Sequence, residues 1–155
     1  MPNTDFRIQP AAAIDIGQLL ASLSGADING WGEADFNGVM GSERGELLVA
    51  SSDNELVGFV ASSSVVDEVT LLNVAVAPAY RRRGLAQALI GRMLKARRSQ
   101  GASRCLLEVR ESNHSARRLY TALGFLIDGR RPDYYRTATG REDAVLMSLT
   151  LENNP

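Results

Sequence analysis

Hydrophobic residues along this 155-residue chain recur with two periods, and the changes of period mark the boundaries of its elements. Apolar runs of strand length, bounded by turn residues, predict strands over 46–51, 55–63, 68–77, 104–110, 125–129 and 142–151. Ser52-Asp53-Asn54 separates the first two runs by a short turn-forming segment. These two strands are therefore predicted to form a β-hairpin.

Helices are predicted where apolar residues recur every three or four positions. The clearest spans 84–99, and its apolar side consists of Leu85, Ala88, Leu89, Met93 and Leu94. Further helices are predicted over 11–24, with Ile14, Leu19, Leu20 and Leu23 as its apolar face, and over 32–40 and 113–123. This order of elements predicts a mixed α/β (α+β) fold with one central mixed sheet flanked by helices.

Composition limits the classes of protein that remain. A length of 155 residues with 45% hydrophobic content fits a single domain over 1–155. No apolar run approaches the roughly 18 residues that cross a bilayer, and the start of the chain lacks a basic region followed by an apolar one, which predicts a cytoplasmic protein. With Cys105 and His114 as the only residues of their types, neither a disulfide nor a bound metal is expected.

Charge is divided unequally along the chain. Residues 1–79 hold eleven Asp and Glu against two arginines, for a net charge of −9, whereas residues 80–155 carry +8. A basic half suits a polyphosphate cofactor and an acidic half suits a cationic amine or basic peptide, unless the two halves simply neutralise each other. No basic and aromatic stripe indicates nucleic acid.

The most informative segment is 74–89, where an apolar strand runs into a basic turn that opens a helix. Arg81 to Ala86 reads R-x-x-G-x-A. Unpaired N–H groups and the dipole at a helix start favour a phosphate there, and Gly84 permits close approach of the backbone. The alternative is an ordinary strand-to-helix connection with solvated arginines.

This segment resembles the acyl-CoA pyrophosphate loop of the GCN5-related N-acetyltransferases (GNAT). A second segment, LEVRESN followed by the ARRLYTALGF sequence at 116–125, resembles the second cofactor-binding segment of the same superfamily. Finer similarity, over about 46–150, is to the bacterial ribosomal-protein alanine N-acetyltransferases (RimI type). The chain departs from related sequences at Arg81 and Ala86, and residues 1–30 match poorly.

The resemblance implies a GNAT fold, in which two parallel strands of the sheet splay apart and acetyl-CoA enters the gap. It assigns the pantetheine arm and thioester to the main chain of Val74, Ala75 and Val76. It assigns the pyrophosphate to Arg82, Arg83, Gly84, Leu85, Ala86 and Gln87. Asn113 would reach the pantetheine amide while it caps a helix. The alternative is that Asn113 only caps the helix.

Two side chains are catalytic candidates by the same resemblance. Glu108 would take a proton from the attacking amine, because strand alternation sets it on the face opposite Cys105; the alternative is a strand carboxylate paired with Arg110 or another arginine. Tyr120 would protonate the departing thiolate, or it would serve only as an aromatic core anchor. Tyr134 and Tyr135 would line the mouth of the site on the side of the acceptor peptide, or they would serve only in packing.

The predicted function is therefore direct transfer of acetyl from acetyl-CoA, in a ternary complex, to a protein N-terminal α-amine. By the finer resemblance the acceptor is alanine of a small-subunit ribosomal protein. Two alternatives remain at this point. One is acetylation of a small-molecule amine, and the other is a non-catalytic acyl-CoA-binding module.

Overall fold

The computed structural model describes residues 6–13 and 15–151. In chain order the elements are β1 (Arg7–Pro10), α1 (Asp15–Ser22), α2 (Glu33–Met40), β2 (Gly45–Ser52), β3 (Glu55–Val65), β4 (Glu68–Val76), the 3₁₀ turn η1 (Pro78–Tyr80), α3 (Leu85–Ser99), β5 (Arg104–Arg110), α4 (His114–Ala122), β6 (Leu126–Thr137) and β7 (Gly140–Thr150). Within the described residues, seven strands form one sheet in the order β1-β2-β3-β4-β5-β7-β6. The predicted mixed sheet flanked by helices is confirmed.

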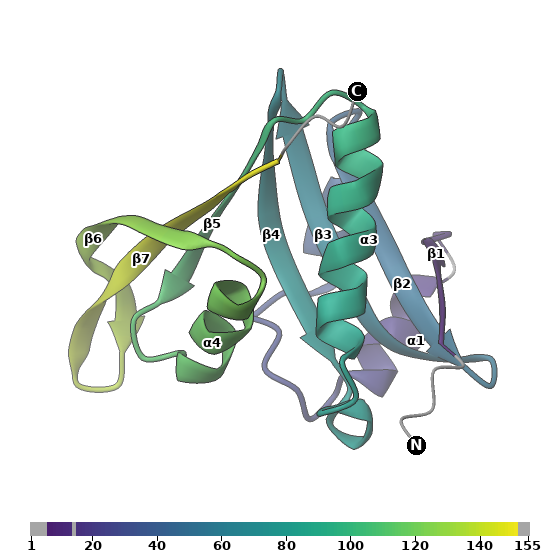
Figure 1. Cartoon of the computed structure of the whole chain (residues 1–155). Helices are drawn as coiled ribbons and strands as arrows, with labels where there is room; N and C mark the ends of the chain where they lie inside the picture. The colour runs from purple at the N-terminus through teal and green to yellow at the C-terminus, as the bar shows by residue number, and fades with distance from the viewer. Residues whose placement is uncertain (1–5, 14, 152–155) are drawn as a thin grey trace.

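Neighbouring strands are antiparallel except for β4 and β5, which are parallel. Figure 1 shows α3 across one face of β2, β3 and β4, with α1 and α2 behind that sheet. The lower ends of β4 and β5 diverge, and α4 lies beside this gap. A parallel pair needs a helical crossover, which α3 supplies.

The predicted hairpin is confirmed as β2 and β3. Its turn residues Asp53 and Asn54 have φ values of 49° and 65°, the left-handed pair that a two-residue hairpin turn requires. The core-facing side of α3 differs slightly from the prediction. Ile90 is buried, whereas Ala88 is exposed and Leu94 is only half-buried.

The N-terminal prediction was wrong in its extent. Residues 7–10 form β1, an edge strand on β2, and the helix predicted over 11–24 begins only at Asp15. The Asp15 carboxylate accepts a hydrogen bond of 2.8 Å from the Ala12 N–H. β1 has no buried residue, so it gives no apolar signal in the sequence. Leu19 and Leu23 are buried as predicted, and Ile14 lies outside the described residues.

The strand predicted over 125–129 was too short. β6 continues to Thr137, almost wholly exposed, with register shifts against β7 after Ile127 and after Arg131. Exposure removes the alternation that predicts a strand, and the bulge that contains Pro132 interrupts the pattern further. β6 forms a hairpin with β7, and the buried residues on β7 include Val145 and Met147.

Candidate functional site

A β-bulge in β4 opens the sheet. Pairing between β4 and β5 ends at Thr70 and Leu106, although both strands continue. On its other edge, β4 places Leu71 opposite Ser62 and Asn73 opposite Ala61, so Leu72 is an extra residue. A bulge bends its strand and increases the local twist. The splay predicted for these two parallel strands is therefore present, and it begins at the bulge.

Beyond the bulge, one edge of β4 has no neighbouring strand. The Ala77 N–H donates to the Val57 carbonyl on β3 at 2.8 Å. Because antiparallel bonding alternates along a strand, the N–H and C=O groups of Val76 and Val74 face the opposite, open edge. Arg81 Nε donates to the Val76 carbonyl at 3.4 Å, which agrees with this direction.

The connection from β4 to α3 has the backbone of an anion-binding turn. Arg82 and Gly84 lie in the left-handed region, with φ values of 61° and 75°. The first backbone bond inside α3 runs from the Ala88 N–H to the Gly84 carbonyl at 3.0 Å. N–H groups before Ala88 at the helix start are left for an outside acceptor.

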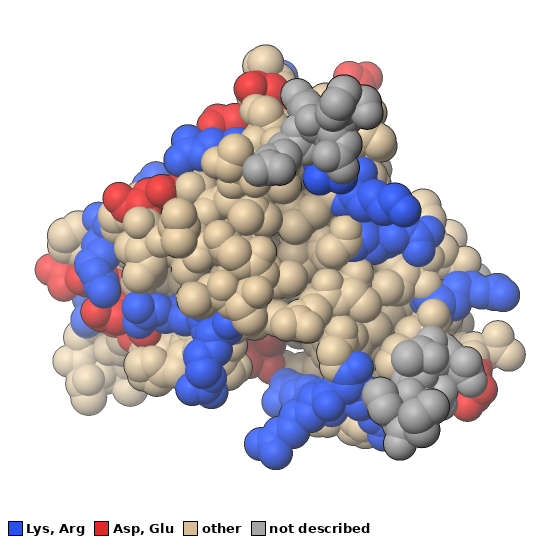
Figure 2. Space-filling view, in the orientation of Figure 1, with Lys and Arg blue, Asp and Glu red and all other residues tan. Residues whose placement is uncertain are grey.

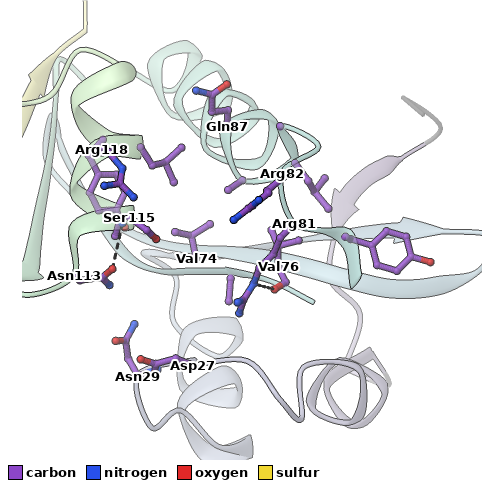
Figure 3. A pocket seen from close by; sticks show the side chains of 18 of the residues that line it. Asp27, Asn29, Val74, Val76, Arg81, Arg82, Gln87, Asn113, Ser115 and Arg118 are labelled. Carbon is purple, nitrogen blue, oxygen red and sulfur yellow. Dashed lines mark hydrogen bonds between the residues drawn. The ribbon is translucent and has the colours of Figure 1, made fainter. Parts of the chain in front are cut away.

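The splay, this helix start and α4 enclose a pocket of about 990 Å³. Figure 3 shows side chains that enter it from three directions: the start of α3, α4, and the segment that carries Asp27 and Asn29 on the other side of β4. Of the twelve predicted site residues, ten line the pocket, and they are Val74, Ala75, Val76, Arg82, Gly84, Leu85, Ala86, Gln87, Asn113 and Tyr120.

Arginines dominate the charge of the pocket. Its charged lining residues among those described are Arg81, Arg82, Arg110 and Arg118, against the single carboxylate of Asp27. Figure 2 shows basic side chains on both sides of a hollow low on this face of the molecule. Such a pocket favours a ligand with several negative charges, because low-dielectric walls strengthen its field.

The start of α4 forms one wall. Asn113 caps this helix, and its Oδ1 accepts a hydrogen bond of 3.2 Å from the Ala116 N–H. The same side chain lines the pocket, so its amide Nδ2 is available to a ligand. Ser115 and Arg118 also line the pocket from α4, as Figure 3 shows.

A buried asparagine fixes the opposite wall. Asn73 is 4% exposed; its Nδ2 donates to the Ile28 carbonyl at 2.9 Å, and its Oδ1 accepts from Asn29 Nδ2 at 2.9 Å. Asn29 has a left-handed φ of 56°, and its N–H donates to the Asp27 carboxylate at 2.9 Å. The 27–29 segment is thus tied to β4 where the open edge of the strand begins.

Tyr120 lies at the inner end of α4 and is 8% exposed. Its ring packs against Phe125 with 5.8 Å between ring centroids. Burial, and then the negative charges that Cys105 and Tyr135 carry when ionised, raise the pKa of the Tyr120 phenol to about 12. The phenol is therefore protonated throughout the neutral range, and it lines the pocket.

Glu108 lies on β5 with the orientation predicted. Leu107 and Val109 are buried, whereas one third of the Glu108 side chain is exposed. Its Oε1 is 3.2 Å from Arg131 Nη2 on β6. Glu108 is not among the pocket-lining residues. Burial, and then the negative charge of Glu108, raise the pKa of the Tyr135 phenol.

The twelfth predicted residue, Arg83, also lies outside the pocket lining. Its guanidinium stacks on the Tyr80 ring at 5.2 Å from the centroid. Lining residues that the sequence did not single out as site residues include Arg81, Asn29, Asp27 and Arg118. Arg81 stands at the first position of R-x-x-G-x-A, and Arg118 lies in the 116–125 segment, so the motifs themselves held the signal for both. Asp27 and Asn29 have no such motif.

Residues 6–13 and 15–151 contain neither a metal-ligand cluster nor a helix that could span a membrane. These residues contain no group of three or more His, Cys, Asp or Glu side chains that could hold a metal ion. Every helix in the same ranges is too short or too polar to span a bilayer.

Comparisons with known proteins agree on one family. A model of the acetyltransferase (GNAT) family matches residues 18–125. A ribosomal protein bS18-alanine N-acetyltransferase from Salmonella typhimurium is 40% identical over 121 residues, which cover 78% of this chain and 81% of that protein. One of the same name from Haemophilus ducreyi is 33% identical over 138 residues, 88% and 94% of the two chains. The crystal structure of the ribosomal-protein-S18-alanine N-acetyltransferase from Escherichia coli matches with a TM-score of 0.88 at 32% identity, over 97% and 96% of the two chains.

Proposed function

Because this chain belongs to the acetyltransferase (GNAT) family, we propose that it transfers acetyl from acetyl-CoA to the N-terminal α-amine of a protein, namely the alanine of ribosomal protein bS18. The observation that carries the proposal is the pocket at the splay of β4 and β5, where an anion-binding helix start, an open strand edge and a protonated phenol converge. A ribosomal acceptor implies that the reaction takes place in the cytoplasm.

Acetyl-CoA binds along this pocket with its pyrophosphate at residues 82–87. The helix start supplies N–H donors, and Arg82 and Arg81 supply positive charge. Arg83 faces the Tyr80 ring instead, so it contributes to the field more than to direct contact. Asn113 Nδ2 donates to a pantetheine carbonyl while Oδ1 keeps its cap.

The open edge of β4 holds the thioester. Its carbonyl oxygen accepts from the N–H of Val76 or Val74, and these donors stabilise the negative charge that develops as the amine attacks. The amine nitrogen forms a bond to the acyl carbon, and the carbon–sulfur bond breaks. An amide and free CoA thiol result, with no acyl-enzyme intermediate; Cys105 is fully buried and therefore unsuited as a nucleophile.

Two protons move in this reaction. An α-amine has a pKa of about 8 and is nucleophilic only when neutral, so Glu108 takes a proton from it directly or through a water molecule. Tyr120 gives a proton to the departing thiolate. Support for the pair is their place in the fold: Glu108 lies on β5, and α4, the next element of the chain, carries Tyr120 at the pocket wall.

The test is incubation of the purified chain with acetyl-CoA and a peptide that carries the N-terminal sequence of bS18, followed by tandem mass spectrometry. We expect acetyl on the terminal alanine nitrogen and one CoA thiol released for each peptide modified. A matched peptide with a blocked N-terminus and an internal lysine is the control. Acetyl found only on lysine, or on no N-terminus, would reject this acceptor class.

The two alternatives give different results in the same assay. Turnover of polyamines or other small amines, with the peptide unmodified, would favour small-molecule acetylation. Tight acetyl-CoA binding without thiol release on any amine would favour a non-catalytic acyl-CoA-binding module.

A further inference from the structure

Glu108, the proposed catalytic base, forms an ion pair with Arg131. Arg131 Nη2 lies 3.2 Å from Glu108 Oε1, and the two side chains are 53% and 33% exposed. Within the described residues, this is the one ion pair that Glu108 makes; Arg110, the nearer arginine in sequence, pairs with Glu142 at 3.3 Å. The proposed base is thus already in contact with a cation.

The geometry of β6 brings Arg131 to this place. Glu108 is opposite Leu146 on β7, and Leu146 is opposite Gly129 on β6, so no β6 side chain lies directly across from Glu108. Arg131 is two residues further along and reaches back into that gap. The strand bulges immediately after it, and the guanidinium also lies over the Tyr134 ring, 5.4 Å from its centroid.

A guanidinium and a protonated N-terminal amine make the same demand on a carboxylate. Both are cations with several N–H donors, and both bind best to a carboxylate oxygen at hydrogen-bond distance. On the direct route of proton transfer, the base must contact the amine whose proton it takes. The acceptor amine and Arg131 therefore compete for one group. Because the existing pair is partly exposed, its strength is modest, and exchange is easy.

We propose that Arg131 is a placeholder cation, which neutralises Glu108 in the resting enzyme and is displaced by the cationic amine of the acceptor. The ring of Tyr134, already beneath the guanidinium, keeps the displaced side chain close by through a cation–π contact. Arg131 is thereby a specificity-determining residue, since a group without positive charge cannot displace it. This inference rests on the proposed function.

Replacement of Arg131 tests the competition. We expect Arg131→Gln to lower KM for a free-amine peptide by about two- to fivefold, the scale of a partly exposed ion pair, with kcat changed less than about twofold. Arg130→Gln is the matched control, because Arg130 precedes Arg131 on β6 and pairs with Glu111 instead. It is expected to change neither constant.

A second peptide separates charge from packing. In its terminal residue, propionyl replaces alanyl, which removes the amine and keeps the shape. Calorimetry in the presence of CoA is expected to show tighter binding of the free-amine peptide to Arg131→Gln than to the parent, and equal binding of the propionyl peptide. A loss of kcat at constant KM would instead mean that Arg131 orients Glu108, and equal tightening of both peptides would mean a steric effect; either result overturns the proposal.

Failure of the proposed function gives a different pattern. If the parent chain modifies no peptide but turns over a small amine, the same KM comparison is made with that amine, and the calorimetric comparison is made with its uncharged analogue. Should no amine be turned over, the function and the placeholder role are both rejected. Peptide turnover with identical KM in parent and Arg131→Gln rejects the placeholder alone.

Discussion

At the scale of single residues, the site combines two ionisable groups in opposite surroundings. Tyr120 is 8% exposed and packed on Phe125, and its pKa is raised to about 12, so it holds its proton. Glu108 lies on the exposed face of β5 against an arginine. The burial of the phenol keeps its proton in place for donation, and the partly exposed carboxylate is open to an amine that arrives from solvent.

Removal of the carboxylate is expected to slow turnover. Glu108→Gln keeps the shape of the side chain and removes the base, so kcat should fall about 10²-fold at pH 7. The loss should shrink as pH rises past about 8, where the amine is neutral without assistance. KM for acetyl-CoA should change little, since Glu108 is outside the pocket lining. Steady-state rates across pH 6–9 check this; unchanged kinetics over that range would remove Glu108 from the mechanism.

Removal of the phenol hydroxyl has a separate signature. Tyr120→Phe keeps the ring contact with Phe125 and should slow the chemical step by at least about tenfold, with acetyl-CoA affinity preserved. Because burial raises the phenol pKa to about 12, Tyr120 itself should cause no loss of kcat up to pH 10 in the parent. Single-turnover rates measure the step. Equal rates in both proteins would mean that another acid serves.

At the scale of elements, the site is made by the places where regular structure stops. The bulge at Leu72 separates β4 from β5, and the left-handed Gly84 ends the connection so that α3 starts with open N–H groups. Neither feature adds a reactive side chain. Each instead exposes backbone donors that a regular sheet or a continuous helix would have used internally.

Two glycines, one directly before α3 and one inside it, provide a matched pair. Gly84→Ala adds a methyl group into open space but at a φ of +75°, so it should cost about 1 kcal/mol of strain and weaken acetyl-CoA binding as the turn shifts. Gly91→Ala, at a helical position with equally open space, should stabilise the chain by about 0.5–1 kcal/mol and leave binding unchanged. Urea unfolding and calorimetry measure both. Equal acetyl-CoA affinity in the two variants would contradict the role of the turn.

At the scale of the whole molecule, the sheet consists of two halves, β1 to β4 and β5 to β7, which diverge where β4 and β5 cease to pair. β1 to β4 carry α3 on one face and α1 and α2 on the other (Figure 1). Glu108 lies on β5 in the other half, and Tyr120 lies on α4, which follows β5 in the chain. Tyr120 and Cys105 lie together within the second half, close enough for the charge of one to raise the pKa of the other. The stability of this half therefore depends on both groups staying neutral.

Alkaline solution is expected to destabilise the fold. Burial raises the pKa of the Cys105 thiol from 9.0 to about 12 and that of Tyr120 from 10.0 to about 12. Their stabilising contribution is complete below the unfolded values and is lost as pH rises toward the folded ones, by about 1.4 kcal/mol per pH unit for each group. Urea unfolding at pH 8 to 11 measures the slope. Cys105→Ala should remove the part that starts near pH 9; an unchanged slope would contradict this account.

Much of the fold followed from local patterns. The β2–β3 hairpin, β5 and α3 were predicted close to their observed bounds, because each has a buried side that imposes a period and a turn or cap that ends it. β1 and most of β6 were missed, since exposed strands obtain their conformation from the neighbour they pair with. Sequence periodicity records burial, and these strands have little of it.

For the site, the sequence by itself determined the turn before α3, the helix cap at Asn113 and the outward face of Glu108, because each depends on residues close together in the chain. Only the tertiary structure brought Asp27 and Asn29 to the far wall through Asn73, and Arg131 to Glu108. These contacts join segments 23 to 45 positions apart. Their partners are chosen by the bulge, the register and the crossing of strands, and no local spacing encodes them.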